Sequence, residues 1–141
     1  MEEQKTKIIN RLFQAWNSGN VSDVLNFYQD NIVREDTALK RAYEKADLTR
    51  IIIGYSSAFP DIHYEVEKII EQGDNIVVCW NVSGHQKGKL MNIPPTGKFI
   101  SFKGVSVLEI TDGKISKVFY MWDEAGMLRQ MGMLTELRHA I

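Results

Sequence analysis

The sequence predicts an α+β fold in which helices pack on one face of a strongly curved, mostly antiparallel sheet. Apolar residues recur at helical spacing in the first third of the chain, and after Pro60 they alternate with a period of two. The Asp112-Gly113 dipeptide between two β-branched runs is typical of a tight hairpin. Helices followed by antiparallel strands favour helices gathered on one sheet face, with one apolar pocket between the layers.

Composition limits the function classes. The 141 residues are predicted to form one domain over 1–141, with a formal net charge of −1 and no basic stripe that would indicate nucleic acid. No stretch reaches the roughly 20 apolar residues of a membrane helix, so no membrane partner is expected. Cys79 is the only cysteine and cannot form an internal disulfide, which favours a cytoplasmic location.

Three helices are predicted, near residues 4–17, 21–28 and 46–58. Each has apolar side chains on one face, and Asn20 or Ser22 is the expected N-cap of the second. The third helix is expected to stop before Pro60, which cannot continue it. Residues 31–36 are a candidate short strand.

The sheet is predicted to run from residue 62 to residue 123, with alternating apolar positions. A loop over 84–97 interrupts it, and Pro94-Pro95-Thr96-Gly97 there is a rigid turn that either shapes the pocket mouth or only connects strands. The tail is predicted to form a last helix from residue 125 to residue 139. An exposed face of such a sheet makes a homodimer the expected assembly.

Asp123 is the candidate catalytic residue. It follows the aromatic run Phe119-Tyr120-Met121-Trp122, and a carboxylate among such side chains loses solvation of its charged form, which suits acid–base chemistry. The alternative is that Asp123 caps the helix that begins near Glu124, a common role for aspartate. The two roles are compatible.

Three other polar residues are candidate supporting groups: Glu109, His85 and Gln86. A three-residue bulged turn would place Glu109 on the same face as Asp123, and a two-residue turn would separate them. His85 lies in a loop, where a histidine is ordinarily just solvated. The three histidines lack metal-ligand spacing, so neither a metal nor another cofactor is expected.

Large aromatic side chains are the expected lining of the pocket. Taken singly, each is more typical of a core, but in a bent sheet closed by helices some must face the ligand space. The candidate lining residues are Trp16, Phe59, Trp80, Phe102 and Tyr120.

An ordered set of motifs resembles the SnoaL-like polyketide cyclases. The set covers nearly the whole chain and comprises Ala15-Trp16-Asn17, Ala58-Phe59-Pro60-Asp61, Gly73-Asp74, Gly84 with Gly88, Ile93-Pro94-Pro95-Thr96-Gly97-Lys98, Gly104-Val105, Asp112-Gly113-Lys114-Ile115, Trp122-Asp123 and Leu128 with Gln130-Met131-Gly132. The resemblance implies a cone-shaped fold, shared with ketosteroid isomerase, scytalone dehydratase and nuclear transport factor. It also implies an intramolecular aldol reaction without cofactor or metal, and it matches Asp123 to the acid/base aspartate of these cyclases.

The sequence departs from that family at three polar positions. Gln86 stands where a histidine is common, Glu35-Asp36 replaces a frequent His-Asp pair, and Glu109 replaces an arginine. The resemblance therefore supports a shared fold more strongly than a shared substrate, and fold alone does not fix function.

The predicted function is a cofactor-free cyclase or isomerase that moves protons on a small apolar carbonyl compound, such as a polyketide-like ligand. One alternative is a non-catalytic protein that binds small molecules in the same pocket. Another is an interaction module that dimerises through its sheet.

Overall fold

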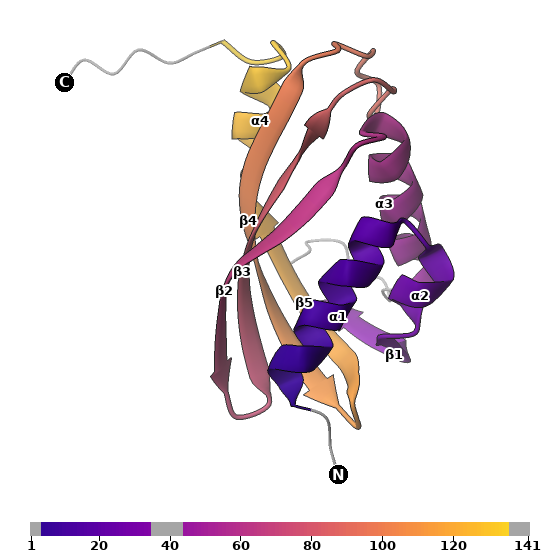
Figure 1. Ribbon diagram of the computed structural model, residues 1–141, viewed down its shortest axis with the longest axis vertical. Coiled ribbons are helices and arrows are strands. Elements are labelled where there is room, and N and C mark those ends of the chain that lie inside the picture. The colour runs from indigo at the N-terminus through magenta and orange to yellow at the C-terminus, as the bar shows by residue number, and fades with distance from the viewer. Residues whose placement is uncertain (1–3, 35–43, 136–141) are drawn as a thin grey trace, which may run out of the picture.

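The computed structural model describes residues 4–34 and 44–135, which form one layer of helices against one five-stranded sheet (Figure 1). The strand order is β1-β5-β4-β3-β2. Helices α1, α2 and α3 cover one face of the sheet, and the sheet twists strongly along its length. This arrangement confirms the predicted α+β class.

The first three helices follow the apolar pattern of the sequence and end where local chemistry ends them. They are α1 (Lys5–Ser18), α2 (Val21–Leu25) and α3 (Lys45–Ala58). Gly19 terminates α1 in the left-handed conformation at φ 72°, and the Asn20 side chain accepts from Asp23 N at 3.1 Å. Asn20 is therefore the N-cap of α2.

The second helix is shorter than the predicted 21–28. Its C-cap is Asn26, and Tyr28 already belongs to β1 (Tyr28–Arg34). This strand corrects the bounds expected for 31–36, of which residues 35 and 36 lie outside the described chain. It pairs in parallel with β5, with Arg34 opposite Val118.

Four antiparallel strands make up the rest of the sheet: β2 (His63–Gln72), β3 (Asn75–His85), β4 (Phe99–Thr111) and β5 (Lys114–Trp122). The tight hairpin predicted at Asp112-Gly113 joins β4 to β5. Of the two turn lengths left open by the sequence, the structure has the two-residue one, with a register shift between Glu109 and Ile110 beside it and φ of 54° and 76° at Asp112 and Gly113. Both values are positive, as a type I′ turn requires.

Even-numbered side chains of β3 and β4 point toward the helices and form the core. They contribute to two clusters of buried residues. The lower cluster is built around Ile9, Leu12, Ile52, Ile76 and Leu108, and the upper cluster around Phe59, Ile93, Ile100, Phe102 and Met127. Trp80 packs against both clusters, so it joins the two halves of the core.

The last helix, α4 (Glu124–Gln130), is much shorter than the predicted 125–139. Met131 is its C-cap, and Gly132 then adopts φ 80°, which turns the chain away from the helix axis. Residues 136–139 lie outside the described chain.

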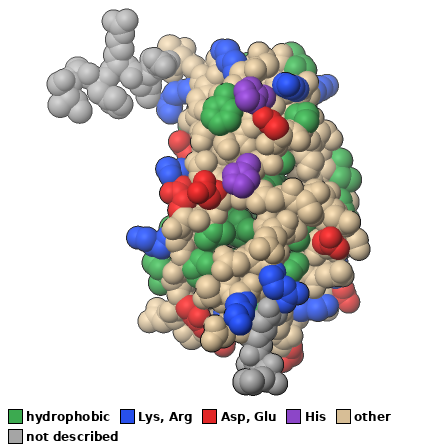
Figure 2. Space-filling model, viewed as in Figure 1, with side chains coloured by type: hydrophobic (Ala, Val, Ile, Leu, Met, Phe, Trp, Pro, Cys, Tyr) green, Lys and Arg blue, Asp and Glu red, His purple; other side chains and the backbone are tan. Residues whose placement is uncertain are grey.

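Charged side chains of both signs are spread over the face seen in Figure 2, as the net charge of −1 suggests. Within residues 4–34 and 44–135, no helix has the length and apolar character needed to cross a bilayer.

Candidate functional site

A row of three residues crosses the inner face of the sheet near its centre. Trp80, Gly104 and Trp122 occupy paired positions on β3, β4 and β5. The Trp80 ring lies over Gly104, and its Nε1 donates to Ser106 Oγ at 2.9 Å. Trp122 Nε1 is buried and has no hydrogen-bond partner within the described chain. The inner face therefore carries polar hydrogens within an aromatic surface.

Aromatic hydroxyl groups lie deeper between the helices and the sheet. Tyr28 is fully buried beside Tyr120 and Trp16. Burial raises the pKa of the Tyr28 hydroxyl, and hydrogen bonding from Tyr120 and Trp16 offsets part of that rise. Burial likewise raises the pKa of Tyr64, whose ring contacts Trp16 with centroids 5.2 Å apart. These phenols stay protonated at neutral pH and can donate hydrogen bonds.

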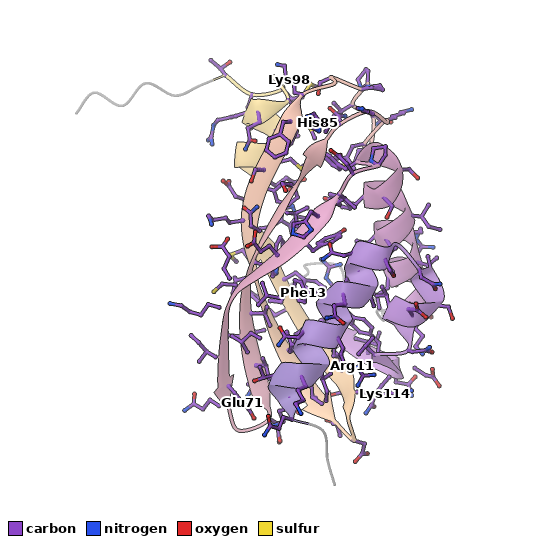
Figure 3. The ribbon with its side chains drawn as sticks, in the orientation of Figure 1. Arg11, Phe13, Glu71, His85, Lys98 and Lys114 are labelled. Atoms are coloured by element: carbon purple, nitrogen blue, oxygen red, sulfur yellow. The ribbon has the colours of Figure 1, made fainter. Side chains whose placement is uncertain are left out.

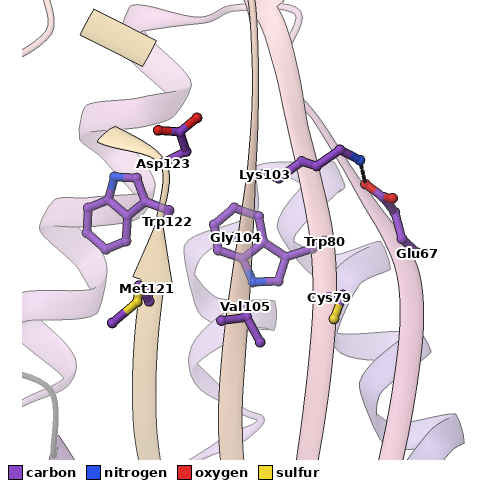
Figure 4. A pocket seen from close by; sticks show the side chains of 9 residues that line it. All are labelled: Glu67, Cys79, Trp80, Lys103, Gly104, Val105, Met121, Trp122 and Asp123. Atoms are coloured by element: carbon purple, nitrogen blue, oxygen red, sulfur yellow. Dashed lines mark hydrogen bonds and ion pairs between the residues drawn. The ribbon is translucent and has the colours of Figure 1, made fainter. Parts of the chain in front are cut away.

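The outer face of the same strands contains an open hollow of about 450 Å³ (Figure 4). Cys79, Val105 and Met121, which are neighbours in register, form its apolar floor. An ion pair on its rim joins Lys103 Nζ to Glu67 Oε1 at 2.6 Å. The volume falls in the range of small-molecule sites.

Asp123 lies on the rim of this hollow, directly after β5. Its backbone N donates to Lys103 O, and its exposed side chain accepts from Gly126 N at 2.9 Å, which makes it the N-cap of α4. Trp80 and Trp122 line the same hollow, whereas Trp16 and Phe102 do not. The placement thus differs from an enclosed apolar pocket, because the strand ends just before Asp123 and frees it to cap the helix.

Glu109 lies far from Asp123. It pairs with Lys117 near the hairpin, and its Oε2 is 3.6 Å from Lys117 Nζ, whereas Asp123 is beside Lys103 toward the other end of β4. A register shift between Glu109 and Ile110 places Glu109 opposite Lys117, on the same face as Val105 and Met121 but at the hairpin end. A supporting role for Glu109 at Asp123 therefore finds no geometric basis.

His85 forms a pair with Asp61 at the upper end of the sheet (Figure 3). His85 Nδ1 is 2.7 Å from Asp61 Oδ2, and Asp61 Oδ1 accepts from His85 N at 2.7 Å. These bonds to His85 hold the pKa of the Asp61 carboxyl below its usual range. The histidine ring is held in one orientation, away from the hollow that Asp123 lines.

Gln86 is completely buried and organises the loop that follows it. Its Oε1 accepts from Thr96 Oγ1 at 2.7 Å and from Thr96 N at 3.2 Å, and its Nε2 donates to Pro94 O at 3.2 Å. All of these partners belong to the loop. Gln86 is therefore a structural residue of the Pro94–Gly97 turn.

The five candidate lining residues all face the core but do not enclose one chamber. Trp16 and Tyr120 pack on the lower cluster, Phe59 and Phe102 belong to the upper cluster, and Trp80 contacts both. Of the five, only Trp80 also lines the outer hollow.

A second open groove, of about 510 Å³, lies between α1, α2 and the β4–β5 turn. Arg11 and Lys114 line it and lie close together in Figure 3, and the Arg11 guanidinium stacks over the Phe27 ring at 5.6 Å. No cluster of three or more His, Cys, Asp or Glu side chains suited to a metal occurs among the described residues.

Sequence reasoning missed the partners that give these residues their roles. Asp61 belongs to a quoted motif, yet nothing in the sequence indicates that it meets His85, which is 24 residues away. Ser106 could have been inferred as an inward position from the alternation of β4, but its bond to Trp80 depends on register. The ion pair between Glu67 and Lys103 depends in turn on a bulge between Val66 and Lys68.

Comparison with known proteins places this geometry in a family. The family model described as SnoaL-like polyketide cyclase matches residues 6–131. The chain is 23% identical over 126 residues to the aklanonic acid methyl ester cyclase AcmA of Streptomyces galilaeus, covering 88% of both proteins.

Solved structures share the fold at similar identity. AclR of Streptomyces galilaeus, named as a candidate hydroxylase, superimposes with a TM-score of 0.85 at 24% identity over 94% of this chain and 87% of AclR. IdmH of Streptomyces antibioticus, named as a candidate polyketide cyclase, gives 0.80 at 22% identity over 92% and 99%. The matched residues include the whole sheet and all four helices except Lys5, and the chain belongs to the SnoaL-like polyketide cyclase family.

Proposed function

We propose that the protein is a cofactor-independent cyclase or isomerase acting on a small, largely apolar carbonyl compound of polyketide type. The supporting observation is that the exposed Asp123 carboxylate lies on the rim of an apolar-floored hollow of about 450 Å³, which Trp80 and Trp122 also line. A ligand on Cys79, Val105 and Met121 would place its reactive carbon near that carboxylate.

The proposed chemistry needs one group that accepts and returns a proton. Asp123 takes a proton from the carbon next to a carbonyl, and the resulting enolate attacks a second carbonyl of the same molecule. One carbon–carbon bond forms, and the proton passes from Asp123 to the new alkoxide oxygen. The balance closes without any cofactor.

Replacement of Asp123 by asparagine tests this role. The relative AcmA is named for aklanonic acid methyl ester, so that compound is the first substrate to assay, with turnover followed by chromatography. Positioned acid–base groups contribute about 10²–10⁴-fold in rate, so Asp123→Asn should lose that factor. Asparagine caps helices about as well as aspartate, so the melting temperature should stay within about 2 °C of wild type. Full turnover by the folded variant would refute the proposal.

A non-catalytic binding protein is the alternative that one observation favours. The Asp123 side chain already accepts from Gly126 N, a bond that needs no substrate to explain it. In that case the wild-type protein should show no turnover, and Asp123→Asn should leave the ligand affinity unchanged. Quenching of Trp80 and Trp122 fluorescence by the same ester would still report binding, which separates the two functions.

We also propose a homodimer formed through the outer sheet face. One row across that face is apolar on all four strands: Ile70, Val77, Val107 and Phe119. Ile70 is 51% exposed. The row lies between the floor of the hollow and the ion pair of Lys117 with Glu109. An apolar patch rimmed by charges is typical of a protein interface.

Light scattering across micromolar concentrations tests the dimer. Val107→Asp should convert it to a monomer, because an unpaired charge would be buried in the middle of this row. Ser116→Asp, at the hairpin end, is the matched control and should stay dimeric. A monomeric wild-type protein at all concentrations would refute both the dimer and the interaction-module alternative. Because Cys79 is the chain's only cysteine, we further propose a cytoplasmic location.

A further inference from the structure

One end of the molecule combines unpaired cations with exposed apolar side chains. The loop from Gln86 to Lys98 joins β3 to β4 there, and the chain after α4 lies at the same end (Figure 1). The Lys98 side chain reaches the second segment, because its Nζ is 3.5 Å from the position that a Cβ would take at Gly132. This set is the basic end, and its members are Lys87, Lys89, Met91, Lys98, Phe99, Arg129 and Met133.

The cations of the basic end lack ion-pair partners within the described chain. Elsewhere in the molecule Lys5, Lys45, Lys103 and Lys117 all pair with carboxylates. The segment from residue 86 to residue 99 contains no acidic residue. The nearby Asp61 is already held by His85. The four cations of this end therefore outnumber Asp61 and Glu124, the nearby carboxylates of the described chain, although the chain as a whole has a net charge of −1.

Three apolar side chains project from the same end. Met91 is 58% exposed, Phe99 is 57% exposed and Met133 is 51% exposed. Figure 2 shows lysine or arginine and apolar side chains together at the upper end of the molecule. The backbone beneath is firmly held, since Leu90 and Ile93 are buried and Gln86 bonds across the loop. The side chains are thus presented outward on a rigid base.

We propose that the basic end docks on an anionic lipid surface. Apolar side chains that enter the headgroup region, ringed by lysine and arginine, are the recognised physical basis of reversible interfacial binding. Neither hollow described above includes a residue of the basic end. Exposed Met91 and Phe99 among cations suit a deformable bilayer, which such side chains can enter. The expectation of no membrane partner rested on spanning helices, and surface contact needs none. The proposal is independent of the proposed function.

Vesicle sedimentation tests the proposal with the full-length protein. The probes are vesicles of phosphatidylcholine alone and vesicles containing 30% phosphatidylserine. Each lysine near an anionic surface contributes a factor of about five in partitioning. Lys89→Gln/Lys98→Gln should therefore bind the anionic vesicles about 25-fold more weakly. The matched control, Lys7→Gln/Lys114→Gln, removes the same charge from the opposite end and should bind like wild type.

The apolar contribution is tested separately with Met91→Asn. Met91 has φ 52°, a conformation that asparagine tolerates well, so this change removes the apolar side chain without straining the loop. Binding should fall at least threefold. Equal binding of wild type to both kinds of vesicle, no binding to either, or equal loss in the two double-lysine variants would overturn the proposal. If Val107→Asp, which disrupts the dimer, were the only variant to lose vesicle binding, the binding would depend on two copies acting together. That result would also overturn the proposal.

Discussion

The packing of Trp80 on Gly104 makes a sharp prediction about stability. A Cβ at residue 104 would overlap Cη2 and Cζ2 of the indole and lie 2.8 Å from its Cζ3. The ring is rigid and packs against both core clusters, so Gly104→Ala must displace it. Overpacking of this kind costs about 1–3 kcal/mol. Loss of the 2.9 Å bond from Trp80 Nε1 to Ser106 adds about 0.5–1.5 kcal/mol.

The expected loss for Gly104→Ala is thus about 2–4 kcal/mol in the free energy of unfolding, or a Tm roughly 6–15 °C lower. Urea denaturation followed by tryptophan fluorescence measures it. Gly54→Ala is the matched control, because no atom lies within 4 Å of its Cβ position inside α3, and it should stabilise by up to about 1 kcal/mol. Adding Trp80→Phe, whose shorter ring avoids the clash, should cost less in the Gly104→Ala background than in wild type. Equal Tm values for the two alanine variants would refute the packing argument.

Two further predictions follow from the buried polar groups. Gln86→Leu should cost about 1–3 kcal/mol and speed amide exchange at Thr96, since it removes the side-chain oxygen that accepts from Thr96 N and Oγ1; unchanged exchange at Thr96 would contradict the role given to Gln86. Burial raises the pKa of Tyr64, so its contribution to stability is complete below the unfolded value near 10 and is lost as the pH rises further, at up to about 1.4 kcal/mol per pH unit. Urea unfolding between pH 9 and pH 11.5 should therefore show a shallower decline for Tyr64→Phe than for wild type, and parallel curves would exclude this effect.

Local signals in the sequence predict the elements of this fold, whereas long-range pairings decide the site. Helical spacing, the Asn20 cap and the Asp112-Gly113 turn act within a few residues, and the structure confirms each of them. The parallel pairing of β1 with β5 joins segments that are distant in sequence, which periodicity cannot reveal. The predicted end of α4, at residue 139, was wrong. The apolar spacing continues past Gly132 to Leu134, but the positive φ of Gly132 breaks the helix.

The same difference between local signals and long-range pairings explains where the structure places the candidate site residues. Their types could be read from the sequence, but their partners depend on register. The register shift beside the hairpin pairs Glu109 with Lys117, far from Asp123, and Gln86 serves the loop because Thr96 folds back onto it. Asp61 precedes β2 and orients the ring of His85, which ends the neighbouring strand β3. Residue chemistry alone therefore overestimated how many polar groups could act with Asp123.

The helix cap also determines how Asp123 can serve as an acid or base. Its Oδ1 accepts from Gly126 N, a bond that restricts the carboxylate, and in the proposed reaction Oδ2 takes the proton. Asparagine can keep the capping acceptor and replace only the second oxygen, so Asp123→Asn separates orientation from proton transfer. Asp123→Ala removes both and should lose about 0.5–2 kcal/mol of stability as well. A cap at this position therefore supplies the rigidity that a general base needs, because a carboxylate held by one oxygen loses little freedom when a substrate meets the other.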